Sequence, residues 1–321
     1  METETQKQKT DRKNGRGSAY VALVFVILIW GTSPIVNAYL YNSYTATICT
    51  AVASFVSGLS LLVICLPHLK KLNKTYFKIA VPTGIFNSVA SLLQKIGLQY
   101  TTPAQYAFLE NLSCVVVPVL LFIFIKKKSG VLTISASILC LVGSFILSGM
   151  SFTGNHIALG KGELLCALAG LCYGVNIAAT GAFGKKLFAP LYVLIQTWIH
   201  TVISFATAIA LNVITVNGAP IEAIKFSWDL RLLLVIVALA LISNTLCWII
   251  RTNVMKRINA SVVAVLMPFS AVVAGVVSVL CGMDTWSVNL ILGASISLVA
   301  AIMSGFGDLQ DNKKAEKESN T

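Results

Sequence analysis

Two ionisable side chains, Lys95 and Glu110, lie inside long apolar runs of this sequence. A charge at such a place is costly in a membrane and usually faces a cavity or a partner. The turn between the two runs is centred near Thr102, so in an antiparallel helical hairpin both groups lie at similar depth, roughly 10 Å below the membrane edge. Two interpretations stay open. The groups form a structural ion pair, or Glu110 carries a coupling proton or binds a cationic group of a solute while Lys95 binds an anionic one.

His200 is a second candidate for proton transfer, because histidine titrates close to neutral pH. It lies in the middle of the apolar run 190–213, one turn after Gln196. A lone histidine among apolar neighbours more often makes a hydrogen bond between helices, and that interpretation also stays open. The candidate proton-coupling residues are therefore Glu110 and His200.

Large aromatic and amide side chains also lie in the middle of apolar runs. Tryptophan and tyrosine rings usually lie at the membrane interfaces, whereas rings inside the membrane suit the walls of a pocket for an organic solute. Ordinary helix packing and hydrogen bonds between helices are the alternatives. The candidate substrate-binding residues are Trp30, Lys95, Glu110, Asn176, Trp198 and Trp248.

Ten apolar runs must position these side chains. Each is long enough to cross a hydrocarbon core of about 30 Å as a helix of roughly 20 residues. The runs lie near residues 20–40, 46–66, 77–99, 103–125, 131–149, 158–181, 190–213, 230–250, 259–281 and 285–306. The composition agrees, with 56% hydrophobic and 11% charged residues. Because the runs are continuous rather than alternating, we predict an all-α polytopic membrane protein with ten transmembrane helices.

The basic residues lie mainly in every second gap between these runs. These residues are Lys7, Lys9, Arg12, Lys13, Arg16; Lys70, Lys71, Lys74, Lys78; Lys126, Lys127, Lys128; Lys185, Lys186; Arg251, Lys256, Arg257; and Lys313, Lys314, Lys317. Basic loops face the cytoplasm, so both termini are predicted to be cytoplasmic. The net charge of +12 then favours contact with anionic lipid headgroups and not with nucleic acid. No organelle address is legible, so a plasma or bacterial inner membrane is expected.

The ten runs divide into two sets of five. Trp30-Gly31 and Tyr173-Gly174 lie at matching depth in the first and sixth runs, and a shift of 156 residues sets Lys95 on Arg251. Since five is odd, the second half enters the membrane inverted, as in many secondary transporters. We expect tails at 1–18 and 307–321 and five-helix repeats at 19–150 and 151–306. Chance similarity between apolar helices is the alternative.

Motifs of enzymes and metal sites are missing from the sequence. It contains no GxSxG, HExxH or P-loop pattern, and its 8 cysteines show no metal-ligand spacing. We therefore expect no enzymatic activity, cofactor, metal or disulfide. The sequence sets no oligomeric state, because helix faces that seal a protomer look like faces that dimerise.

Four short motifs give the chain a family resemblance. They are Trp30-Gly31-Thr32-Ser33-Pro34, Gly97-Leu98-Gln99-Tyr100-Thr101-Thr102-Pro103-Ala104, Gly160-Lys161-Gly162-Glu163-Leu164-Leu165 and Leu292-Gly293-Ala294-Ser295. With them, residues 20–306 resemble the ten-helix EamA-type members of the drug/metabolite transporter superfamily. The resemblance implies a secondary transporter, expected to be an exporter, of small metabolites such as amino acids. It implies alternating access, with proton coupling as an option. The alternative is efflux of drugs or lipophilic cations by the same fold.

Overall fold

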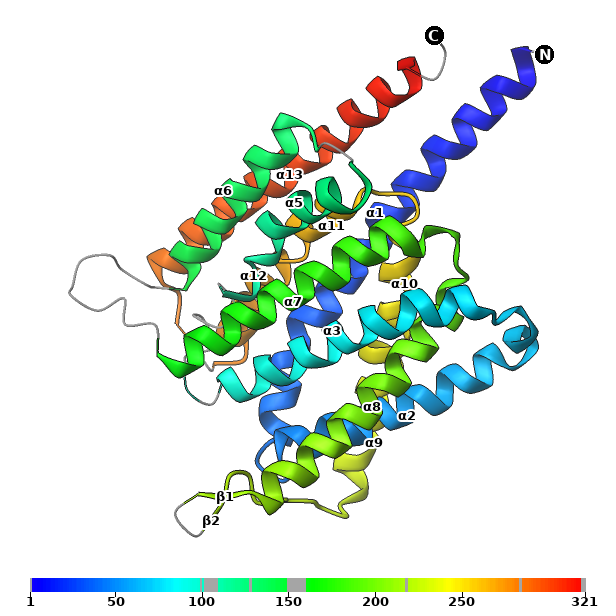
Figure 1. The fold of residues 1–321 in the computed structure, drawn as a ribbon. Helices are drawn as coiled ribbons and strands as arrows, with labels where there is room; N and C mark the ends of the chain where they lie inside the picture. The colour runs from blue at the N-terminus through cyan, green and yellow to red at the C-terminus, as the bar shows by residue number, and fades with distance from the viewer. Residues whose placement is uncertain are drawn as a thin grey trace.

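Helices occupy each of the ten apolar runs in the computed structural model, which describes residues 2–98, 100, 109–126, 129–148, 160–216, 219–282 and 285–318 (Figure 1). They are α1 (Glu2–Leu40), α2 (Ala46–Cys65), η1 (Leu66–Lys71), α3 (Lys74–Leu98), α5 (Ser113–Ile125), α6 (Val131–Leu147), α7 (Lys161–Phe183), η2 (Gly184–Lys186), α8 (Ala189–Val213), α9 (Leu230–Leu239), η3 (Ala240–Leu246), α10 (Cys247–Val254), α11 (Ala260–Leu266), α12 (Phe269–Leu280) and α13 (Val288–Glu318). The strands β1 (Thr215–Val216) and β2 (Ala219–Pro220) form one antiparallel hairpin.

Seven helical stretches of the described chain are long and apolar enough to cross a membrane. The helices α5 and α6 are apolar but shorter, and α3 is not among the seven although it has 25 residues. A helical membrane protein is thus confirmed, while the count of ten crossings remains a prediction. The start of the predicted run 103–125 and the predicted boundary at 150 lie outside the described residues.

Proline and a π-helical segment interrupt two of the later stretches. Helix α11 ends before Pro268, which has no N–H to donate and opens α12. Between α9 and α10, η3 is π-helical, and the Thr245 hydroxyl donates to the carbonyl of Ala240, five residues earlier. One extra residue in a helix turns everything after it by about 100°. The π-helical segment therefore sets which way the side chains of α10 point.

The helices of the bundle pack against one another in pairs that are distant in the sequence. Helix α3 packs against both α7 and α8, α2 against α8, α5 against α7, and α1 against α12. Helices α6 and α13 lie side by side at one edge of the bundle (Figure 1). Their approach is close at Gly143 and Gly293, since a Cβ on Gly143 would lie 3.1 Å from the Gly293 carbonyl. Small residues at such crossings are typical of helices packed in a membrane.

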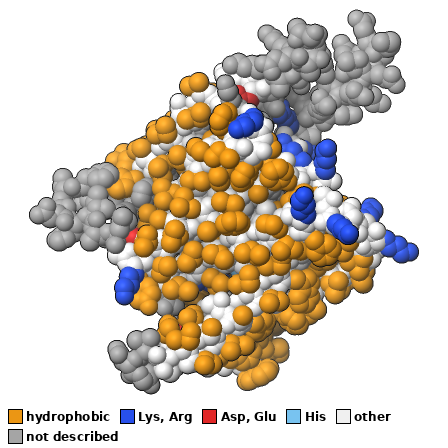
Figure 2. All heavy atoms as spheres, viewed as in Figure 1, with side chains coloured by type: hydrophobic (Ala, Val, Ile, Leu, Met, Phe, Trp, Pro, Cys, Tyr) orange, Lys and Arg blue, Asp and Glu red, His pale blue; other side chains and the backbone are white. Residues whose placement is uncertain are grey.

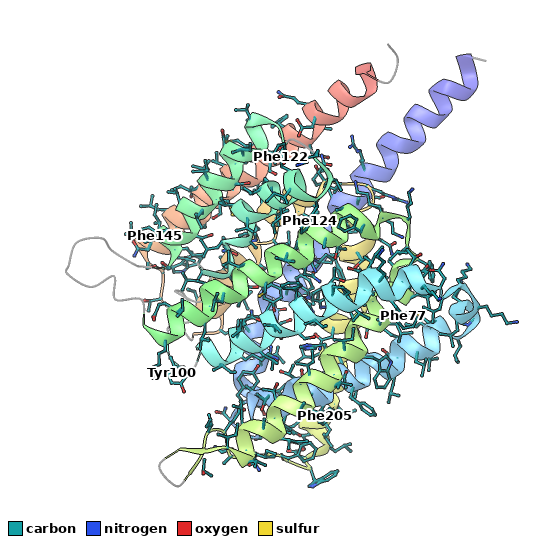
Figure 3. The ribbon with its side chains drawn as sticks, viewed as in Figure 1. Phe77, Tyr100, Phe122, Phe124, Phe145 and Phe205 are labelled. Atoms are coloured by element: carbon teal, nitrogen blue, oxygen red, sulfur yellow. The ribbon has the colours of Figure 1, made fainter. Side chains whose placement is uncertain are left out.

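Apolar side chains cover the outer helix faces, as Figure 2 shows for one side of the molecule. Phe77 is 50% exposed and Phe122 44% exposed, and both are labelled in Figure 3. Exposed basic side chains gather instead at the turns η1 and η2, where Lys70, Lys71, Lys185 and Lys186 are found. A broad apolar belt between polar ends is the surface that a bilayer requires.

A buried carboxylate joins α1 to α13 at the end of the bundle where both termini lie (Figure 1). Asp308 of α13 is 0% exposed, accepts a hydrogen bond from Tyr20 (3.2 Å) and forms an ion pair with Arg16 (3.7 Å). Asn259, which precedes α11, donates its amide to the same carboxylate at 2.8 Å. The described parts of the predicted tails, residues 2–18 and 307–318, thus belong to α1 and α13, and Asp308 is a packing residue.

Candidate functional site

Two tryptophans and one arginine meet inside the bundle between α1 and α10. The ring centroids of Trp30 and Trp248 are 5.5 Å apart and tilted by 54°. The guanidinium carbon of Arg251 lies 4.7 Å from the Trp248 centroid and 5.9 Å from the Trp30 centroid. These distances are typical of cation–π contacts. We call Trp30, Trp248 and Arg251 the aromatic–arginine cluster.

Neighbouring polar groups hold the aromatic–arginine cluster in place. The Trp30 indole donates to the Ser243 carbonyl at 3.2 Å, and the Ser33 and Ser243 hydroxyls are also 3.2 Å apart. Ser243 lies in the π-helical segment η3, which therefore connects α1 to the helix that carries Arg251. The hydrogen bond to Ser243 holds the Trp30 ring beside Trp248 and Arg251.

Glu110 lies in a second polar group, between α3 and α7. Gln94 of α3 donates to the Glu110 carboxylate at 3.1 Å, and the Tyr173 hydroxyl of α7 donates to the Gln94 side-chain oxygen at 2.8 Å. Glu110 and Tyr173 are also within electrostatic range of Arg251. Arg251 of α10 is thus near side chains of α1 and α7, and Gln94 of α3 is hydrogen-bonded to the same α7 residue.

Asn176 belongs to a third, structural group between α3, α7 and α8. It is 0% exposed and donates to the Thr83 carbonyl at 3.0 Å. The Thr83 hydroxyl accepts from Tyr192 and from Gln196, each at 2.8 Å. Thr180 and Tyr192 share a further hydroxyl contact of 2.8 Å. These hydrogen bonds join Thr83 of α3 to side chains of α7 and α8, so the network links three helices.

Thr83→Val is expected to destabilise the protein by about 1 kcal/mol, the usual value of a hydrogen bond between helices in a membrane. The change keeps the side-chain shape but leaves the Tyr192 hydroxyl and the Gln196 amide short of an acceptor. Thermal unfolding in detergent measures the effect, with Thr75→Val as the control. Thr75 is an exposed residue of the same helix, and equal unfolding temperatures for the two variants would contradict the prediction.

Two of the remaining candidate residues, Lys95 and Trp198, have contacts with α2. Lys95 donates to the Thr50 hydroxyl of α2. Trp198 packs on α2, with its ring 3.2 Å from the Cβ position of Gly58 and edge-on to Phe55. Lys95 and Glu110 thus have different hydrogen-bond partners, and Trp198 has the environment of a packing residue.

His200 lies on α8, where its Nδ1 is buried and has no hydrogen-bond partner among the described residues. Lys95 is within electrostatic range of this ring. Among the described residues, this nitrogen therefore does not make the hydrogen bond between helices that was the alternative interpretation of His200.

Arg251 is the residue that the sequence analysis misplaced. The sequence pattern predicted that Arg251 lies in the basic loop after the run 230–250. That prediction was wrong, because α10 continues to Val254 and Arg251 is only 4% exposed. The alignment of Arg251 with Lys95, a basic residue inside a run, was the signal in the sequence. Gln94 and Tyr173 were also missing from the predicted site, and only their polarity within apolar runs marked them.

Comparisons with known proteins agree with this architecture. Residues 17–149 match the EamA-like transporter family. An uncharacterized transporter of Archaeoglobus fulgidus is 24% identical over 286 residues, which cover 89% of this chain and 85% of that protein. A solved crystal structure has a TM-score of 0.70 at 16% identity and covers 92% of this chain and 98% of its own, which shows a shared fold.

Proposed function

We propose that the chain is a secondary transporter that exports small organic metabolites, amino acids or related compounds, by alternating access. The match of residues 17–149 to the EamA-like transporter family and the similarity to an archaeal transporter support the transporter function. The observation that carries the proposal is the aromatic–arginine cluster, with Trp30 from the first predicted repeat and Trp248 and Arg251 from the second. A site built from both halves changes shape when the halves move.

Two matching glycine contacts support the inverted repeat. A Cβ on Gly31 would lie 2.5 Å from Val273 Cβ, and a Cβ on Gly174 would lie 3.3 Å from Val116 Cβ. Gly174 follows Gly31 by 143 residues, and Val273 follows Val116 by 157. The first helix of each half thus meets the fourth helix of the other half in the same way.

The other helix contacts follow the same exchange of halves. The contact of α3 with α8 corresponds to the contact of α2 with η3. In the same way, the contact of α3 with α7 corresponds to that of α1 with α10, and the contact of α5 with α6 corresponds to that of α12 with α13. These pairs support ten crossings, two inverted five-helix repeats and both termini on one side of the membrane. The basic turns support a cytoplasmic location for that side.

Glu110 and His200 are the proposed proton-coupling residues. Glu110 lies among neutral donors and close to the aromatic–arginine cluster, so its protonation changes the charge beside the site. Efflux of lipophilic cations is the competing function. It needs an acidic aromatic pocket, whereas the aromatic–arginine cluster carries a positive charge.

Flux through the purified protein in proteoliposomes tests the proposal. We expect one or more L-amino acids to stabilise the protein thermally and to move faster when a pH gradient is imposed. Flux that ignores the gradient would remove the proton-coupling role. Movement of tetraphenylphosphonium without movement of any amino acid would overturn metabolite export in favour of cation efflux.

A further inference from the structure

Arg251 has the features of a receptor for an anionic group. Its side chain is 96% buried, given an exposed fraction of 4%, and its Nε has no hydrogen-bond partner. The guanidinium makes two cation–π contacts. It forms no ion pair and no hydrogen bond with any of the described residues. Arginine stays charged in proteins, and a buried charge without a counter-ion is strongly unfavourable. An anion bound beside such a group would therefore be strongly favoured.

The orientation of the guanidinium determines which anion it can bind. The Trp248 and Trp30 rings lie beside it, with centroids 4.7 Å and 5.9 Å from its central carbon, and neither ring can accept a conventional hydrogen bond from its edge. The N–H donors point outward in the plane of the group and stay available, and this edge matches a carboxylate with two parallel hydrogen bonds. The ring of Trp30 is itself held by its bond to the Ser243 carbonyl.

Glu110 does not neutralise Arg251 directly. It is within electrostatic range, but it accepts a hydrogen bond from Gln94 and its carboxylate forms no ion pair with this guanidinium. An acid group and a cation that both lie within the bundle suit a solute that carries a carboxylate. The carboxylate would contact Arg251, away from Glu110.

Lys95 occupies the corresponding position in the other half. Lys95 precedes Arg251 by 156 residues. Cys49 lies within electrostatic range of Lys95. Tyr192, which follows Cys49 by 143 residues, lies within electrostatic range of Arg251. Lys95, however, donates to the Thr50 hydroxyl. The two cations are therefore related by the proposed repeat, and only Arg251 keeps its donors without hydrogen-bond partners in the described residues.

We propose that Arg251, which lies beside Trp30 and Trp248, binds the carboxylate of the transported solute and so selects anionic or zwitterionic solutes. This assignment rests on the proposed transport function and names the chemical group that its site recognises. The aromatic rings hold the guanidinium, and the guanidinium edge binds the solute. A phosphate ester presents related oxygen acceptors, and the test distinguishes it from a carboxylate.

The test compares one solute with and without its carboxylate. Proteoliposomes contain the full chain, either wild type or with Arg251→Gln, Arg251→Lys or the control Arg231→Gln. Arg231 is an exposed residue near the start of the same helical stretch. The probes are the L-amino acid that the wild type carries fastest, its carboxamide, phenyl phosphate as a competitor, and tetraphenylphosphonium.

The wild type and Arg231→Gln are expected to favour the amino acid over its carboxamide by about 30-fold or more in half-saturating concentration, as for removal of a buried charge partner. In Arg251→Gln this preference is expected to fall to about onefold, because the amide has no ionic pairing to offer. Arg251→Lys keeps the charge without the planar edge and is expected to retain an intermediate preference. If Arg251→Gln fails to fold, the comparison of Arg251→Lys with wild type decides the question.

Different failures have different meanings. Equal transport of acid and carboxamide by the wild type would overturn the role of Arg251 while leaving metabolite transport intact. Stronger competition from phenyl phosphate than from the amino acid would overturn the assignment to a carboxylate. Movement of tetraphenylphosphonium alone would overturn both the transport proposal and this inference. A loss that affects acid and carboxamide equally in Arg251→Gln would show that Arg251 is a packing residue.

Discussion

Glu110→Gln is expected to reduce amino-acid flux in proteoliposomes by at least about 100-fold while leaving the folded state intact, as for loss of a positioned proton-transfer group. The substitution removes the titrating proton but keeps the shape and an oxygen that can accept from Gln94, the donor to Glu110 at 3.1 Å. The free energy of unfolding should therefore change by less than about 1 kcal/mol. Flux with and without a pH gradient measures the effect.

Exchange of bound solute is a sharper readout for the same variant. A carrier that cannot release its proton still exchanges internal for external solute, so Glu110→Gln should retain exchange after it has lost net flux. Glu163→Gln, in the first turn of α7, is the matched control and should behave as the wild type. Normal net flux in Glu110→Gln, still driven by the pH gradient, would contradict a role for Glu110 in coupling.

Gly31→Ala is expected to destabilise the protein by about 3 kcal/mol, the upper range for overpacking in a tightly packed interior. The added Cβ would lie 2.5 Å from Val273 Cβ and 2.8 Å from the Ser270 carbonyl oxygen. A backbone atom cannot rotate away, so α1 and α12 must separate. Trp30 is the neighbouring residue, so transport should fall together with the unfolding temperature.

Two other glycines complete the Gly31 experiment. A Cβ on Gly17, in the same helix, meets nothing within 4 Å, whereas one on Gly174 would lie 3.1 Å from Val116 Cγ1. Alanine is intrinsically the better helix former by about 1 kcal/mol. Unfolding temperatures should therefore be highest for Gly17→Ala, lower for Gly174→Ala and lowest for Gly31→Ala. Equal temperatures for Gly17→Ala and Gly31→Ala would show that α1 and α12 are not in close contact.

Hydropathy predicts where the helices lie because each crossing needs a long apolar segment whatever its neighbours are. Hydropathy does not predict which way a side chain faces. All three of Trp30, Trp248 and Trp198 were expected to line a site, which stays a prediction; Trp30 and Trp248 lie together, whereas Trp198 packs edge-on against Phe55 of α2. A tryptophan has the same apolar character in both environments, so only the packing of the helices distinguishes them.

The charge pattern predicted the position of some basic residues correctly and of one basic residue wrongly. Lysines at the turns were correctly expected at the surface, where Lys70 and Lys185 are exposed. Arg251 follows the same pattern in the sequence but is buried. The rule about basic loops counts residues near helix ends, and it cannot distinguish a residue in the last turn of α10 from one just beyond it. The rotation introduced by the π-helical segment η3 is also invisible to hydropathy.

The contact between Tyr20 and Asp308 has a consequence for biosynthesis. The two residues are 288 positions apart, and a ribosome adding about 5–20 residues per second needs roughly a quarter of a minute to a minute to make that stretch. During this time α1 is already synthesised, yet the carboxylate that receives Tyr20 and Arg16 does not exist. Newly inserted α1 must therefore wait in the lipid, or beside the insertion machinery, until α13 arrives to complete its polar contacts.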